Sequence, residues 1–221
     1  MAFLSSETLY AKSMQFIHES KQMPLEARRE QLIDIALQLT DESLQAQFLN
    51  YLDIMSVRPV AQKAVRGCVE TIRKASIPMT NKLAHGLTEP ELDQLVDFSN
   101  RLIVGVKGSQ GYVGYPVTSA VVENFEKAFV SIRAGNGAAE IERLQEALVE
   151  MTRCAYYTFF EEPLALMELG MVKRKLTDVA LKVCRSATLT LIGSVFKGMP
   201  QQELEAVVDY LESMIYDGSK Q

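Results

Sequence analysis

The chain has 221 residues, of which 48% are hydrophobic and 23% are charged, and its formal net charge is −5. This composition is too apolar for an intrinsically disordered chain, and charges interrupt its apolar runs too often for a membrane span. The negative net charge argues against a general nucleic-acid binder. We therefore expect a protein that folds in water, with no membrane span and no nucleic acid as partner.

The first thirteen residues contain no basic segment followed by a long apolar run, so no signal peptide is expected. The three cysteines, Cys68, Cys154 and Cys184, are an odd number without CxxC spacing. Buried free thiols in a reducing compartment are the simplest interpretation, even for Cys184 beside Arg185. The expected location is cytoplasmic.

The chain resembles itself at an offset of 112 positions. Without a gap, 17 residues are identical between 27–103 and 139–215, whereas composition alone predicts roughly 5. Gly86 and Gly198 form one of these pairs, although an amphipathic helix requires no glycine there. The match predicts two tandem copies of one helical unit. The alternative is the general resemblance of any two amphipathic helices.

Apolar residues recur every three to four positions in most of the chain, which is typical of helices packed by one face. We expect an all-α bundle of about ten helices in two tandem pseudo-symmetric units. The first unit covers 1–108, a Gly-rich linker covers 109–116, and the second unit covers 117–221. Whether they pack as one globular domain stays open. The expected helices lie near 5–21, 25–39, 41–57, 59–76 and 88–104, and near 117–133, 137–151, 153–169, 171–197 and 200–216.

Several residues predict helix boundaries. Thr88 followed by Glu91 has the spacing of a capping box, and Asp41 is expected to cap a third helix. Pro78 predicts a break or kink in the fourth helix of the first unit, and Pro163 predicts a kink in the third helix of the second.

Signatures of catalysis are absent from the sequence. His18 and His85 belong to no HExxH or His/Cys cluster, and we expect both at the surface. No GxSxG or SxxK motif occurs, and the pair Glu161–Glu162 lacks the Glu-x-x-His that a di-metal bundle uses. We therefore assign no catalytic residue, no metal ligand and no cofactor, and the sequence leans away from an enzyme.

The expected fourth helix is basic in both units, and the fifth is acidic. Its bases are Arg58, Lys63, Arg66, Arg73 and Lys74 in the first unit, and Lys173, Arg174, Lys175, Lys182 and Arg185 in the second. The simpler interpretation is internal pairing, with Arg73 and Arg185 facing Asp97 and Asp209. The alternative is two anion sites for phosphate, a nucleotide, an acidic peptide or a lipid headgroup. The candidate anion-binding residues are Lys63, Arg73, Lys175 and Arg185.

Aromatic residues cluster once, in the segment 156–171. Such a stripe is typical of a core, but it also fits an apolar pocket between the units or a groove for a partner helix. The candidate pocket or groove residues are Tyr156, Tyr157, Phe159, Phe160, Leu164, Met167 and Met171.

The leading hypothesis is a non-enzymatic helical interaction or regulatory protein, with a protein partner or a homo-oligomer. One alternative is a small-molecule or lipid-binding protein with a cavity between the units. Another is an enzyme that uses carboxylates without a recognisable motif. An internal cavity lined by residues 156–171 would favour ligand binding, whereas a large exposed apolar patch would favour the interaction protein.

Overall fold

A computed structural model describes residues 1–54, 59–196 and 198–216 of the chain. Helices make up 81% of it, together with a small three-stranded sheet, so the predicted all-α class is confirmed. The first half contains α1 (Glu7–Glu19), α2 (Leu25–Leu44), α3 (Asn50–Ile54), α4 (Pro59–Ala84) and α5 (Glu89–Leu102). The second half contains α6 (Ser119–Ser131), α7 (Gly137–Tyr156), α8 (Glu162–Ala165), α9 (Met171–Val195) and α10 (Gln201–Ser213).

Short helical segments connect some of these helices. A 3₁₀ turn, η1 (Ser20–Gln22), follows α1, and π-helical segments follow α2, α6 and α7. The π-helical segments are η2 (Gln45–Leu49), η3 (Ile132–Asn136) and η4 (Tyr157–Glu161). Gly135 interrupts η3 with a φ of 90°, a conformation that glycine adopts without steric cost.

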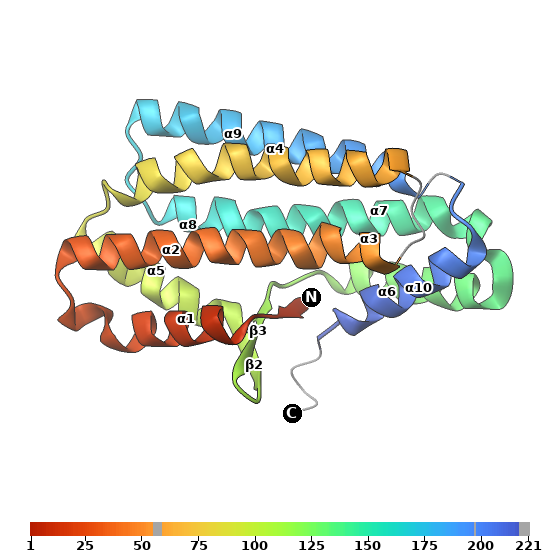
Figure 1. Cartoon of the computed structure of the whole chain (residues 1–221), viewed down its shortest axis with the longest axis horizontal. Coiled ribbons are helices and arrows are strands. Elements are labelled where there is room, and N and C mark those ends of the chain that lie inside the picture. Colours follow the sequence, from red (N-terminus) through yellow and green to blue (C-terminus); the bar gives the residue numbers. More distant parts are fainter. Residues whose placement is uncertain (55–58, 197, 217–221) are drawn as a thin grey trace.

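The helices form three layers (Figure 1). The long helices α4 and α9 lie side by side and antiparallel as one outer layer, and α2 and α7 form the middle layer. On the other side of the middle layer, α1 and α5 lie beneath α2, while α6 and α10 lie beneath α7. The middle helices are therefore covered on two faces, and the outer pair keeps one face toward solvent.

The starts of corresponding helices are separated by 112 residues. These starts are Glu7 and Ser119, Leu25 and Gly137, Pro59 and Met171, and Glu89 and Gln201. The π-helical segments η2 and η4 are separated by the same interval. The spacing of identical residues in the sequence is thus also the spacing of the elements.

The Gly-rich region between the halves forms a β-hairpin. Strands β2 (Ile103–Lys107) and β3 (Gln110–Gly114) pair antiparallel, and β1 (Ala2–Leu4) pairs with the other edge of β3. Gly108 in the turn has a φ of 63°, which favours glycine. Most of the expected linker 109–116 therefore lies in or beside β3, where valine and tyrosine alternate with glycine.

Two expected helix boundaries were wrong. Helix α2 continues past Asp41 to Leu44, and the helical path then continues through η2 and α3 to Ile54. The second half repeats this, because α7 continues through η4 into α8. No glycine or proline separates the expected helices, so Asp41 alone does not end one. The remainder of the first half's expected third helix, 55–57, lies outside the described residues.

The prolines have smaller effects than expected. Helix α4 continues through Pro78 to Ala84 instead of ending near residue 76, because Pro78 lies on its exposed face. Pro163 lies in α8 directly after η4, but Tyr51 holds the equivalent position after η2. A π-helical segment therefore precedes both positions with or without proline. The capping box of Thr88 and Glu91 is confirmed.

The two halves share a hydrophobic core. One cluster joins Val65, Cys68 and Ile72 of α4 to Cys184 and Leu191 of α9. Burial of such side chains is the main stabilising contribution in a bundle of this size. In the described part of the chain, no helix is long and apolar enough to cross a membrane.

Candidate functional site

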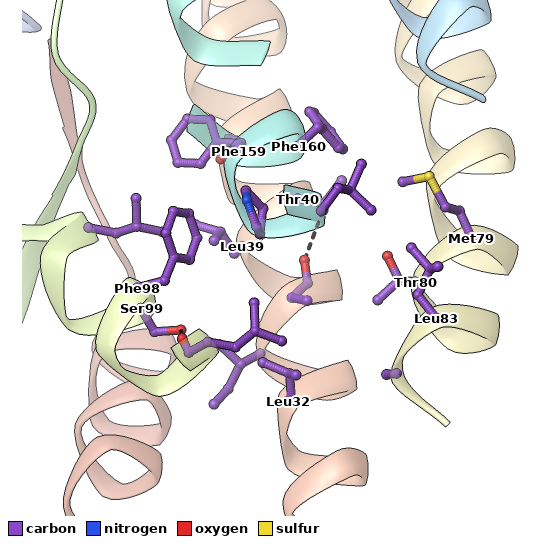
Figure 2. Close-up of a pocket in the computed structure, with 18 of the residues that line it drawn as sticks. Leu32, Leu39, Thr40, Met79, Thr80, Leu83, Phe98, Ser99, Phe159 and Phe160 are labelled. Atoms are coloured by element: carbon purple, nitrogen blue, oxygen red, sulfur yellow. Dashed lines mark hydrogen bonds between the residues drawn. The ribbon is translucent and has the colours of Figure 1, made fainter. Parts of the chain in front are cut away.

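A partly enclosed cavity of about 180 Å³ lies between α2, α4, α5 and the segment η4–α8. Figure 2 shows Leu32, Leu39 and Thr40 of α2 facing Thr80 and Leu83 of α4 across it. Its lining is predominantly apolar, and no charged side chain contributes among the described residues. The lining residues include Leu32, Ile35, Ala36, Leu39, Thr40, Ser43, Met79, Thr80, Leu83, Ala84, Leu95, Phe98, Ser99, Phe159, Phe160, Pro163, Leu164 and Met167.

The cavity contains a few hydroxyl groups. The Thr40 hydroxyl donates to the Ala36 carbonyl at 2.8 Å, and the Ser99 hydroxyl donates to the Leu95 carbonyl at 2.8 Å. Both are satisfied within their own helices. The buried Ser43 hydroxyl has no hydrogen-bond partner in the described part of the chain. An apolar cavity with one unsatisfied hydroxyl suits a mainly hydrocarbon molecule better than a strongly polar one.

The π-helical segments η2 and η4 both border the cavity. Segment η2 contributes Phe48, and η4 contributes the adjacent Phe159 and Phe160. A π-helical turn changes the helical register, so consecutive residues can face the same side. Phe160 stacks on Tyr156 with ring centroids 5.5 Å apart. Segments of this kind often occur at functional sites.

The structure gathers most of the predicted pocket residues and separates two of them. Tyr156, Phe159, Phe160, Leu164 and Met167 line the cavity. Tyr157 and Met171 do not line it, since they are 57% and 77% exposed.

A second cavity of about 40 Å³ lies in the other half, between η2, α7 and α9. For ten of its eleven lining residues, the position 112 residues away lines the larger cavity. The two cavities therefore occupy corresponding places in the two halves.

Side-chain size explains much of the difference in volume. Three small residues of the larger cavity correspond to larger residues in the smaller one: Ala36 to Leu148, Thr80 to Ile192, and Ala84 to Phe196. Only the aromatic segment pointed to this cavity from the sequence. The missed signal was the set of small residues whose counterparts 112 positions later are large.

The candidate anion-binding residues are not brought into one site. Arg73 pairs with Asp41 of α2 at 2.7 Å, and Arg185 pairs with Glu161 of η4 at 2.5 Å. The expected partners Asp97 and Asp209 were wrong, because α4 and α9 pack on each other and on the middle layer. Asp209 instead pairs with Arg133, 2.7 Å away.

Lys63 and Lys175 are exposed and lie near the starts of α4 and α9. Because the two helices are antiparallel, the two lysines lie toward opposite ends of the pair (Figure 1). Among the other predicted bases, Arg58 lies outside the described residues.

The cysteines are buried as predicted at two of three positions. Burial raises the pKa of the Cys68 thiol to about 11 and also raises the pKa of Cys184. Both thiols are therefore protonated and poorly nucleophilic at neutral pH. Cys154 is half-buried. His18 and His85 are exposed, as predicted, and within the described ranges no three His, Cys, Asp or Glu residues are grouped as metal ligands.

The fold and the cavity define an all-helical protein with an apolar cavity where its two halves meet. In comparisons with known proteins, no protein-family model, no curated protein and no solved structure matched this chain.

Proposed function

We propose that this protein binds a small, mainly apolar molecule in the cavity between α2, α4, α5 and η4. The observation that carries the proposal is the difference between the two corresponding cavities. Packing normally fills such spaces, and an unfilled apolar cavity lowers stability. Leu148, Ile192 and Phe196 fill the corresponding space in the other half. An open cavity at Ala36, Thr80 and Ala84 is therefore consistent with an occupant.

The volume indicates the size of that occupant. A protein cavity of about 150 Å³ accommodates benzene. A cavity of about 180 Å³ fits a ring or an aliphatic chain of similar size. This is the small-molecule alternative among the hypotheses from the sequence.

We further propose that the chain arose by tandem duplication of one helical unit. The proposed arrangement is a ten-helix bundle with pseudo-symmetric units at 1–108 and 117–221, joined through 109–116. The shared offset of sequence identities, helix starts and cavity linings supports it. The small cavity residues then mark a difference between the copies.

The proposal can be tested with 1-octanol and a variant that fills the cavity. Ala84→Phe introduces the residue found at the corresponding position 196. Wild-type protein should bind one equivalent of 1-octanol by titration calorimetry. Its unfolding midpoint should rise, because ligand at ten times Kd adds about 1.4 kcal/mol to native-state stability. Ala84→Phe should lose at least tenfold in affinity.

The matched control is Ala64→Phe, since Ala64 lies on the same helix, is exposed and lines neither cavity. This control should bind 1-octanol like the wild type. Failure of the wild type to bind 1-octanol, or equal binding by Ala84→Phe, would contradict the proposed site.

The outer face of α4 and α9 favours a second candidate, the interaction protein. These helices carry seven large apolar residues that are exposed: Val60, Ile77, Met171, Val172, Val179, Val183 and Leu189. An exposed apolar face of this kind is typical of an interface with another protein. Native mass spectrometry tests self-association, and a Val179→Lys variant should remove any dimer that uses this face.

A further inference from the structure

A groove of about 790 Å³ lies beside the apolar cavity, between α9 and the segment that runs from η4 through α8 to Leu169. Leu164 and Met167 line both spaces. These two side chains therefore form the partition between them. Methionine is unbranched and flexible, so a partition that contains Met167 can adjust to a molecule passing it.

Charged side chains line the groove but not the cavity. The charged lining residues are the bases Arg174, Lys182 and Arg185 and the acids Glu161 and Asp178. Arg185 and Glu161 neutralise each other in an ion pair. No ion pair within 4.0 Å joins Arg174, Lys182 or Asp178 to any described residue. Two bases and one acid remain, so the groove has an excess positive charge.

The contrast between the two spaces restricts where an ionised headgroup can lie. Moving a carboxylate into an apolar space without a partner costs several kcal/mol at least, so it would not stay ionised in the cavity. In the groove, the same carboxylate stays in contact with water and near Lys182. A molecule that crosses the partition would have its hydrocarbon part in one space and its charge in the other.

We propose that the bound molecule is an amphipathic anion, with an aliphatic chain in the cavity and a carboxylate in the groove near Lys182 and Arg174. This inference rests on the proposed function, because it assigns the cavity to the hydrocarbon part. The cavity limits that part to a short chain of about six to eight carbons, by comparison with the size of cavity that holds benzene.

The test compares octanoate with 1-octanol, which have the same chain length and differ in charge. At neutral pH, octanoate should bind the wild type more tightly than 1-octanol does in titration calorimetry. The double variant Arg174→Gln with Lys182→Gln should weaken octanoate binding about two- to fivefold, the range for partly exposed ion pairs. It should leave 1-octanol binding unchanged. Asp178→Asn should strengthen octanoate binding, because it removes the unpaired acid.

Lys175→Gln is the matched control, since Lys175 lies on the same helix but lines neither space. It should alter neither affinity. If 1-octanol binds while octanoate binds no better and ignores the charge variants, the anion inference is overturned and the proposed function stands. If the double variant weakens both ligands equally, the inference is also overturned. If neither ligand binds, the proposed function fails as well.

Discussion

At the scale of single residues, Glu91 connects the start of α5 to the segment that closes the cavity. Its Oε2 accepts hydrogen bonds from the backbone N–H and the hydroxyl of Thr88, each at 2.7 Å. Its Oε1 accepts from the backbone N–H of Glu168 at 2.6 Å. Glu168 directly follows Met167, so this buried carboxylate fixes one side of the partition.

Hydrogen bonding gives Glu91 a pH-dependent contribution to stability. Burial alone would raise its pKa, but the hydrogen bonds from Thr88 and Glu168 and the charge of Lys173 hold the pKa below the ordinary 4.5. A lowered pKa in the folded state means that the ionised form stabilises the fold. This contribution is complete above the ordinary pKa of 4.5 and is lost as the pH falls from there through the lowered pKa.

We predict that Glu91→Gln lowers the free energy of unfolding by about 1–3 kcal/mol at pH 7, because a buried donor loses a charged acceptor. Urea unfolding at pH 7 and at pH 3.5 measures this. The difference between variant and wild type should shrink at the lower pH. Glu89→Gln is the control, since Glu89 is exposed in the same turn. A constant difference at both pH values would show that the carboxylate's charge is unimportant.

At the scale of elements, α4 tolerates Pro78 at a cost. Proline has no N–H to donate to the carbonyl four residues earlier, and its ring crowds that carbonyl. Pro78 is exposed, so no packing compensates for this. Packing of the rest of α4 against α9 and α2 therefore keeps the helix continuous where local propensity favours an end.

We predict that Pro78→Ala stabilises the protein by about 1–3 kcal/mol, because the helix gains a hydrogen bond and a good helix former. Thermal unfolding followed by circular dichroism measures the gain. Pro90→Ala, in the first turn of α5 where proline is well tolerated, should change stability little. A loss of stability in Pro78→Ala would mean that α4 requires the proline for its packing.

At the scale of the whole molecule, two corresponding spaces have different contents. One is open and apolar, and the other is mostly filled by its own side chains. Phe196 is 4% exposed and lines the filled one. If the halves correspond as proposed, removing this ring should create a second binding space.

We predict that Phe196→Ala destabilises the protein by about 3–5 kcal/mol, as is usual for a buried phenylalanine. It should also raise the number of bound 1-octanol molecules from one to two. Calorimetric stoichiometry decides this. The milder Ile192→Thr keeps the experiment informative if Phe196→Ala does not fold. One bound molecule in both folded variants would contradict the correspondence of the two spaces.

Local chemistry determined much of the fold in advance. The spacing of apolar residues predicted the helical class, and the Thr88–Glu91 spacing predicted a cap, because both depend on residues a few positions apart. The apolar flanks of Cys184 indicated a buried thiol for the same reason. The aromatic segment supplied one wall of the cavity, with Tyr156, Phe159 and Phe160.

Other features depend on contacts between distant segments. The partners of Arg73 and Arg185 follow from the packing of α4 on α9 and on the middle layer, which charge pattern alone does not specify. The small strand β1 exists because residues 110–114 offer it a free edge. The cavity is bounded by α2, α4, α5 and η4, and its volume is the space their side chains leave between them. The sequence by itself determined which segments are helical and which faces are apolar, and only the tertiary structure decided where those faces fail to meet.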